Sequence, residues 1–85
     1  MSGRNRHVDY TLRPIRYTNY ARARMRQRFI RPDDVWWVLE NHESDRPGQT
    51  AARRELVGVP GMRRILVVIE PSDTEVLVIN AFPVD

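Results

Sequence analysis

The sequence predicts an α+β domain in which two helices near the N-terminus pack on an antiparallel sheet of three or four strands. Three observations lead to this prediction. Residues 20–29 are rich in Ala, Arg, Met and Gln, which favour helices, and residues 32–42 carry apolar side chains at helical spacing. Residues 51–82 are instead rich in Val, Ile and Leu and are divided by Pro-Gly and Pro-Ser-Asp turns. The 85 residues provide one core, so a single domain is expected over residues 10–85, after a flexible basic arm over residues 1–9.

The first helix is expected to run from Tyr20 to about Phe29. Its arginines alternate with other residues at a period of two, as in a half-buried strand. The segment has no β-branched residue, however, and consists mainly of strong helix formers. Thr18 or Asn19 provides an N-cap whose side-chain oxygen can accept a backbone hydrogen bond. The composition therefore predicts a helix for this segment.

The second helix is expected from Pro32 to Asn41 or His42. Proline suits the first turn of a helix, and the two aspartates that follow it place negative charge at the positive end of the helix dipole. Apolar residues recur at i, i+3 and i+4 and mark the buried face. Trp36 flanks this face, whereas Trp37 points away from it and is predicted to contact a partner.

Three strands are expected in the second half of the chain, over residues 51–59, 62–70 and 75–82. Before them, residues 44–50 are polar and contain Pro and Gly, which is typical of a flexible loop. Residues 10–18 can add a short edge strand that a proline interrupts. The last two strands are almost continuously apolar, which is typical of strands covered on both faces. Two helices cover only one face, so we expect the N-terminal arm or a second copy of the chain, in a homodimer, on the other.

Charge is distributed very unevenly along the chain. Residues 1–31 hold nine Arg and one acidic residue, a balance of 9 − 1 = +8, while residues 32–85 hold five Arg and ten acidic residues, a balance of 5 − 10 = −5. A polyanionic partner at the basic end is expected, either a nucleic acid or an acidic protein. The chain has no Cys and two His, so neither a metal nor a cofactor is expected. No apolar segment is long enough for a signal peptide or a membrane span, and a cytoplasmic protein without membrane contact is expected.

The first predicted helix and the residues after it contain a recognisable pattern, which consists of Tyr20-Ala21, Arg24-Met25, Arg28-Phe29-Ile30 and then Val35. It resembles the signature HA-x-x-RM-x-x-RG-I-x-x-x-x-V of the domain-of-unknown-function family numbered 4258, which is similar to small RelE-like and BrnT-like toxins of toxin–antitoxin systems. The resemblance implies their fold. Many of these toxins are metal-independent ribonucleases, so it also implies RNA cleavage without a metal. Two residues depart from the signature, since Tyr20 replaces His and Phe29 replaces Gly.

Arg24 and Arg28 lie one turn apart on the same side of the predicted helix, with Tyr20 one turn earlier. Two like charges beside an apolar seam need an anion nearby, which is either a glutamate of the predicted sheet or a bound phosphate. In the second case the two arginines hold the scissile phosphate and stabilise the charge of the transition state, and Tyr20 contacts the attacking 2′-hydroxyl. Neighbouring residues of a strand point to opposite faces, so one arginine of each Arg-Arg pair can join this site, and Arg54 and Arg64 are predicted to do so.

A further set of arginines is expected to contact a nucleic-acid backbone or an acidic antitoxin-like protein: Arg13, Arg16, Arg22, Arg26 and Arg31. For Arg22 and Arg26 the alternative is a solvated helix face. Two functions follow from these patterns. One is a toxin-like, metal-independent endoribonuclease that binds RNA through its arginine-rich helix. The other is a noncatalytic, dimeric protein-interaction module of the same fold, in which Tyr20 in place of the motif His marks a degenerate site.

Overall fold

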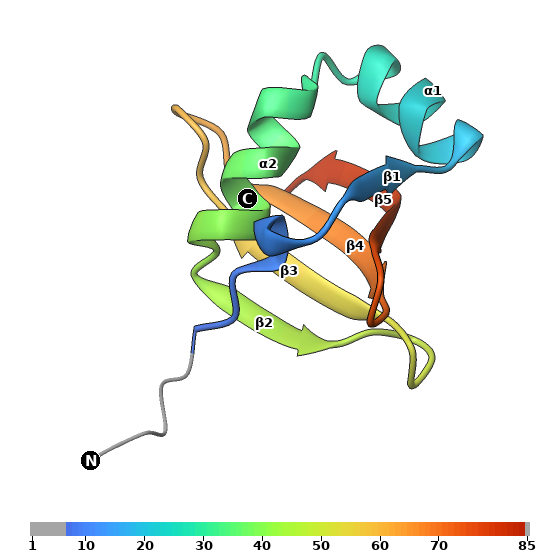
Figure 1. The fold of residues 1–85 in the computed structure, drawn as a ribbon. Coiled ribbons are helices and arrows are strands. Elements are labelled where there is room, and N and C mark those ends of the chain that lie inside the picture. Colours follow the sequence, from blue (N-terminus) through green and yellow to red (C-terminus); the bar gives the residue numbers. More distant parts are fainter. Residues whose placement is uncertain (1–6, 85) are drawn as a thin grey trace.

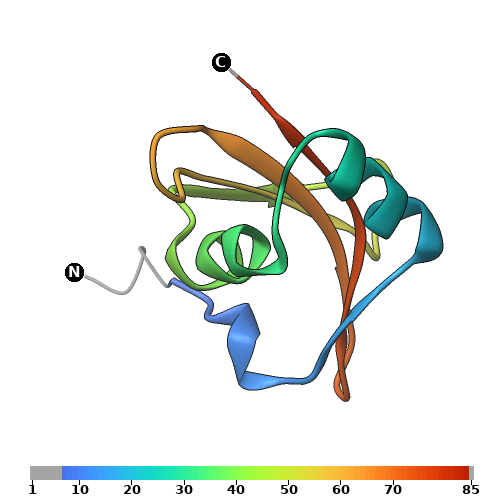
Figure 2. The same ribbon diagram turned by 90° about the horizontal axis from the view of Figure 1, so that it is seen from above.

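The computed structural model describes residues 7–84 (Figures 1 and 2). In chain order this part contains the 3-10 helix η1 (Tyr10–Leu12), β1 (Ile15–Tyr17), α1 (Asn19–Gln27), α2 (Pro32–Asn41), β2 (Ser44–Pro47), β3 (Arg54–Gly58), β4 (Ile65–Pro71) and β5 (Val76–Pro83). No helix within these residues has the length and apolar character that crossing a membrane requires.

The strands form one sheet in the order β1-β5-β4-β3-β2. Strands β2 to β5 pair antiparallel, but β1 runs parallel to β5, with Ile15 opposite Val76 and Tyr17 opposite Val78. The predicted α+β class with two helices is confirmed, whereas the predicted antiparallel sheet of three or four strands is wrong: the described residues form five strands in a mixed sheet. A parallel pair needs a long connection between its strands, and here both helices and three strands lie between β1 and β5. The RelE/BrnT-like assignment of this fold stays a prediction.

Strand β2 lies in the segment that was predicted to be a flexible loop. Its sequence, Ser-Asp-Arg-Pro, has no strongly apolar residue, so no hydrophobic pattern identifies it as a strand. Pairing with β3 holds it in place, with Ser44 opposite Val57 and Pro47 opposite Arg54. Strand β2 is at the edge of the sheet and pairs with β3 alone. A proline at its end therefore removes no hydrogen bond from the ladder between β2 and β3.

Helix α1 has the predicted N-cap at Thr18, and α2 begins at Pro32 as predicted. The Thr18 hydroxyl oxygen accepts a hydrogen bond from the backbone N–H of Ala21 at 2.9 Å, which caps α1. At α2, the carboxylate of Asp34 accepts a hydrogen bond from the backbone N–H of Arg31 at 2.9 Å, and Pro32 is the first helical residue. These local contacts explain why sequence alone identified the two helices.

The turn between the helices contains an unusual aromatic residue. Phe29 has a φ of 56°, in the left-handed region, and its side chain is 85% exposed. The backbone N–H of Ile30 donates to the carbonyl of Met25 at 2.9 Å, which closes the end of α1. The guanidinium group of Arg63 donates to the carbonyls of Arg28 and Phe29, at 2.9 and 2.8 Å, and so satisfies acceptors that a helix end leaves open.

The core lies between the helices and one face of the sheet, which curves around α2 (Figure 2). Its buried side chains are Tyr10, Ala21, Met25, Ile30, Val35, Val38, Leu39, Leu56, Ile65, Val67, Ile69, Val76, Val78 and Ala81. Helix α1 packs against β5. Three residues of the β5 edge pair with β1, and α1 lies along the part of that edge beyond them. This position puts α1 at the border between the two faces of the sheet (Figure 2).

The other face of the sheet has no helix packed across it within residues 7–84. It carries apolar side chains that are only half-buried: Val57, Leu66, Val68, Leu77, Ile79 and Phe82. Residues 7–9 of the predicted arm and the η1 helix after them pack on the α2 side, where the ring of His7 stacks on that of His42 at 4.1 Å and Tyr10 joins the core. It therefore does not supply the predicted cover, and residues 1–6 lie outside the described part of the chain. A second copy as the cover stays a prediction.

The two tryptophans of α2 are exposed to the same extent. Trp36 is 45% and Trp37 47% exposed. The expectation that Trp36 packs better than Trp37 is wrong, because the sheet and η1 contact the helix on its Val35, Val38 and Leu39 side. The role of Trp37 at a partner interface stays a prediction.

Candidate nucleic-acid interface

Three of the predicted site residues lie together along α1. Tyr20, Arg24 and Arg28 are spaced about one helical turn apart. They lie on the side of the helix that borders the uncovered sheet face. The guanidinium carbon of Arg24 is 5.5 Å from the centroid of the Tyr20 ring. That of Arg28 is 5.5 Å from the Phe82 ring centroid, and Arg28 also donates a hydrogen bond to the carbonyl of Ala81 at 3.0 Å. These contacts hold the Arg28 guanidinium beside β5 and that of Arg24 over the Tyr20 ring, and neither group belongs to an ion pair within residues 7–84.

The predicted glutamate partners do not neutralise Arg24 and Arg28. The ion pairs among residues 7–84 are Arg16–Glu75, Arg53–Glu70, Arg54–Asp45 and Arg64–Glu43. Arg24 donates instead to the side-chain oxygen of Gln27 at 3.2 Å, and its Nε is buried without a hydrogen-bond partner among the described residues. Ion pairs with glutamates of the sheet therefore do not explain the arginine pair within residues 7–84, and phosphate binding stays a prediction.

A pocket of about 260 Å³ opens on the uncovered face beside Tyr20. It is lined by Tyr20, Gln49, Arg53, Glu55, Val68, Ile79, Asn80 and Phe82. Arg53 and Glu55 are two residues apart and therefore share this face of the sheet. The carboxylate of Glu55 has no hydrogen bond or ion pair with any residue of the described chain. The Nε of Arg53 is 3.5 Å from the carboxylate of Glu70, a distance that gives an ion pair but no hydrogen bond.

A β-bulge adds a polar group to this pocket. In the ladder between β4 and β5, Val68 lies opposite Asn80 but Ile69 lies opposite Val78, so Ile79 is the extra residue. A bulge changes the direction of successive side chains, and here both Ile79 and Asn80 line the pocket. The side-chain oxygen of Asn80 accepts a hydrogen bond from the backbone N–H of the next residue at 2.9 Å. The side-chain NH₂ group of Asn80 therefore stays available as a donor.

Arg54 and Arg64 do not join the predicted site. Arg54 lies on the face that α2 covers, where its Nε is 2.7 Å from the carboxylate of Asp45. Arg64 pairs with Glu43 at 3.6 Å near the start of β2. The alternation of β3 puts residues 54, 56 and 58 toward the helices, which the sequence pattern did not reveal. The neighbour Arg53 occupies the position that was predicted for Arg54, and neither Arg53 nor Glu55 was among the predicted catalytic residues.

Arg54 belongs to a polar cluster that has a structural explanation. The hydroxyl of Tyr10 donates to the second carboxylate oxygen of Asp45 at 2.6 Å. Burial, followed by this hydrogen bond, raises the pKa of Tyr10 to about 12. The hydrogen bond to Asp45 likewise raises the pKa of Arg54. The nearby His42 is buried, and its Nδ1 is 3.1 Å from the carbonyl of Val38. The cluster holds η1, β2 and β3 together and leaves no charge unpaired.

The remaining predicted arginines are spread over three regions. Arg16 forms two hydrogen bonds to the Glu75 carboxylate, at 2.9 and 3.0 Å, and Arg13 donates to the carbonyl of Ser72. Both lie near the turn before β5. The exposed residue Arg31 precedes α2, and Arg22 and Arg26 line a second pocket on the other side of α1. The predicted basic surface is therefore divided by α1.

Residues 7–84 hold no group of three or more His, Asp or Glu side chains placed to bind a metal ion. Comparison of the chain with protein-family models, with curated proteins and with solved structures gave no match.

Proposed function

We propose that the protein binds single-stranded RNA on its uncovered sheet face and cleaves it by attack of a 2′-hydroxyl on the adjacent phosphodiester. The observation that supports this proposal most is the convergence of Tyr20, Arg53 and Glu55 in one pocket. A carboxylate, a guanidinium and a phenol are the groups that this reaction uses as base, charge stabiliser and proton donor. Arg24 and Arg28 lie along the same side of α1 and have no carboxylate partner within residues 7–84.

Glu55 is the proposed general base. Its carboxylate accepts the proton of the 2′-hydroxyl as the 2′-oxygen forms a bond to phosphorus. The bond from phosphorus to the 5′-oxygen breaks, and that oxygen takes a proton from the hydroxyl of Tyr20. The products are a 2′,3′-cyclic phosphate and a free 5′-hydroxyl. Exchange with water returns Glu55 and Tyr20 to their starting protonation states.

The arginines stabilise the charge on the phosphate. Arg53 is two residues from the proposed base and on the same face of the sheet, and its half-exposed guanidinium can exchange its 3.5 Å contact with Glu70 for a phosphate oxygen. Arg24 and Arg28 bind the same phosphate or the next one along the strand. Loss of one donor to a transition-state oxyanion costs about 10²- to 10³-fold in rate.

The experiment combines binding and cleavage of a fluorescent single-stranded RNA in EDTA. Binding should weaken with salt with a slope of about −2 in a plot of log K against log salt, because about three arginines each neutralise a phosphate with a slope near −0.7. Cleavage should give cyclic-phosphate ends. Glu55→Gln and Arg24→Gln should each lower the cleavage rate at least about 100-fold. The control is Arg64→Gln, which removes an exposed arginine that does not line the pocket and whose ion pair with Glu43 is 3.6 Å long.

Two results would count against the proposal. Cleavage that Glu55→Gln leaves unchanged would place the reaction elsewhere or identify a contaminating nuclease. Binding that Arg24→Gln and Arg64→Gln weaken equally would show that net charge, and not this face, attracts RNA.

The uncovered apolar face also favours a second candidate, a noncatalytic module that binds a protein partner. Leu66, Val68 and Leu77 would be buried in such a complex. RNA binding without any cleavage, combined with dimer formation or capture of an acidic antitoxin-like protein, would support this candidate.

A further inference from the structure

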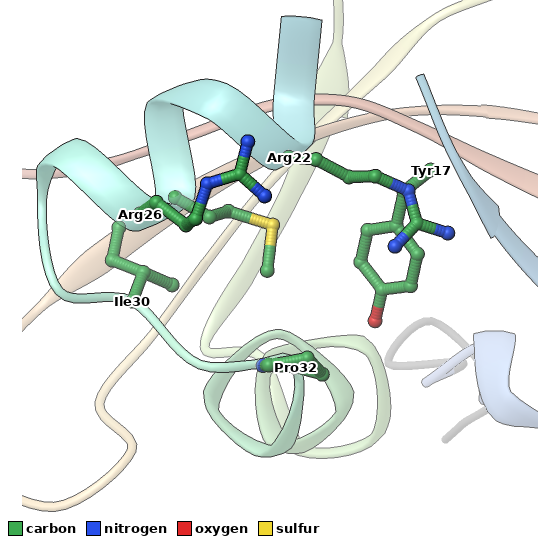
Figure 3. Close-up of a pocket in the computed structure, with 6 residues that line it drawn as sticks. Tyr17, Arg22, Arg26, Ile30 and Pro32 are labelled. Carbon is green, nitrogen blue, oxygen red and sulfur yellow. The ribbon is translucent and has the colours of Figure 1, made fainter. Parts of the chain in front are cut away.

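A second pocket lies on the other side of α1 from Tyr20. It has a volume of about 120 Å³ and is lined by Tyr17, Arg22, Met25, Arg26, Ile30 and Pro32. Figure 3 shows Arg26 and Ile30 on one side, Arg22 and Tyr17 on the other, and Pro32, the first residue of α2, between them. The pocket therefore joins β1, α1 and α2 and shares no residue with the proposed RNA site.

Two guanidinium groups face this pocket without an anionic partner among the described residues. Arg22 and Arg26 are four residues apart, so they lie one turn apart on the same side of α1 and repel each other. The guanidinium carbon of Arg22 is 5.3 Å from the centroid of the Tyr17 ring, and this stacking holds its charge at the edge of the pocket (Figure 3). Neither arginine belongs to an ion pair within residues 7–84. An anion between them would relieve the repulsion.

The rest of the lining is apolar. Met25 and Ile30 are buried members of the core, and Pro32 and the half-buried ring of Tyr17 complete the surface. A closed cavity of roughly 150 Å³ can accept a benzene molecule, so an open pocket of about 120 Å³ suits an apolar group of similar or smaller size. Pockets with this composition bind ligands that combine an apolar body with a few placed polar groups.

The hydroxyl of Tyr17 adds a hydrogen-bond donor. Burial raises the pKa of Tyr17; Arg22 opposes this shift, and the carboxylate of Asp33 adds to it. The hydroxyl is therefore protonated at neutral pH and can donate to an oxyanion. The nearby carboxylate of Asp33 partly offsets the two arginines, so it should weaken the binding of an anion.

We propose that this pocket binds a small organic anion, namely a carboxylate or a phosphate monoester attached to an apolar group about the size of one ring. Arg22 and Arg26 bind the oxyanion, and Met25, Ile30 and Pro32 contact the apolar group. The pocket is separated from Tyr20, Arg24 and Arg28 by α1, so this proposal does not depend on RNA cleavage.

The test is a titration of methyl-labelled protein, observed by NMR at the Met25 and Ile30 methyl groups. Phenyl phosphate and benzoate are the probes. Benzyl alcohol is the uncharged control, and inorganic phosphate is the control without an apolar group. At least one anionic probe should give saturable shifts at both methyl groups, and both controls should bind at least about tenfold more weakly, since each lacks half of the proposed contacts. The tighter of the two probes identifies the oxyanion class.

Three variants make the test specific. Arg26→Gln should weaken the better probe about tenfold or more, while Arg46→Gln, which makes the same charge change at an exposed site on β2, should leave it unchanged. Asp33→Asn should strengthen binding, because it removes the opposing charge. The side chain of Arg26 is exposed and makes no hydrogen bond among the described residues, so its replacement should not unfold the protein. The proposal is overturned if neither anion saturates, if benzyl alcohol binds equally well, or if Arg26→Gln has no effect.

Discussion

Arg53 and Arg54 are neighbours in the chain, yet their guanidinium groups lie on opposite faces of the sheet. Arg54 is 2.7 Å from the carboxylate of Asp45 on the face that α2 covers. Arg53 lines the pocket on the uncovered face, together with Tyr20 and Glu55. The two residues carry the same charge and are both half-buried, so the same substitution at each position separates a role in stability from a role at the proposed site.

The first prediction uses this pair. Arg53→Gln should lower RNA cleavage about 100-fold and leave the unfolding temperature nearly unchanged, because its ion pair with Glu70 is long and partly exposed. Arg54→Gln should leave cleavage by the folded protein unchanged and lower stability by about 1–3 kcal/mol, since it leaves Asp45 without its charged partner. Both variants should be measured by thermal unfolding and by cleavage below the unfolding transition. The opposite result, a destabilised Arg53→Gln that still cleaves RNA, would mean that the pocket is not the reaction site.

The helices were predictable because their signals are local. Thr18 lies three residues from the N–H that it caps, and Pro32 with its aspartates marks the start of α2 within four residues. Strand β2 was not predictable, because residues 44–47 are polar and become a strand only by pairing with β3, whose residues lie about ten positions away. The parallel pairing of Ile15 with Val76 depends on contacts across most of the chain, which no local pattern contains.

The site was predictable only in part for a similar reason. Helical spacing placed Tyr20, Arg24 and Arg28 on one side of α1, and the structure has them there. To choose between Arg53 and Arg54, one must know which of the alternating side chains of β3 face the helices. A run of two arginines followed by a glutamate does not reveal this. Glu55 could have been found from its position beside Arg53, because alternation places the pair on one face whichever face that is.

The second prediction concerns the hydroxyl of Tyr10. Its pKa is raised to about 12 in the folded protein by burial and by the hydrogen bond to Asp45, whereas a tyrosine in the unfolded chain titrates near pH 10. The folded protein holds this proton more tightly, so the stabilisation is complete below about pH 10 and is lost as the pH rises toward 12. Urea unfolding at a series of alkaline pH values should show this loss. Tyr10→Phe should be less stable at pH 9 and show a shallower decline, and an unchanged slope would assign the decline to other groups, such as Tyr17, whose pKa is also raised.

The third prediction concerns the strained turn at Phe29. A left-handed backbone costs a non-glycine residue about 1–2 kcal/mol, and the exposed ring gains little from burial. Phe29→Gly should therefore raise the free energy of unfolding by about 1 kcal/mol, or the unfolding temperature by about 4–8 °C in a domain of this size. Phe29→Ala, which keeps the strain, should not do so. A lower unfolding temperature for Phe29→Gly would mean that the ring contributes contacts to the folded state.

The fourth prediction is self-association through the uncovered sheet face. Leu66 lies on this face near the start of β4, the middle strand of the sheet, and does not line the RNA pocket. Sedimentation equilibrium at micromolar concentration should show a dimer, and Leu66→Glu should shift it to monomer while the core on the other face keeps the fold intact. Trp37→Ala tests the other exposed apolar surface. A dimer that only Trp37→Ala disrupts would place the interface on α2. A monomer at all concentrations would exclude both surfaces as dimer interfaces.

The last prediction asks what Tyr20 contributes. Its ring lies under the Arg24 guanidinium at 5.5 Å and its side chain lines the pocket with Glu55, so the hydroxyl is placed to donate a proton to the leaving oxygen. Tyr20→Phe keeps the ring and should lower cleavage about 100-fold without changing RNA affinity, because general acid catalysis typically contributes 10²- to 10⁴-fold. Tyr20→His introduces an imidazole, which titrates near pH 6.5 and is a better proton donor at neutral pH. Cleavage by Tyr20→His should therefore exceed that of the wild type near pH 6 and fall as the pH rises through 7. If the wild type and Tyr20→His are both inactive while RNA still binds, the arginines and the pocket serve recognition alone and the noncatalytic module is the better description.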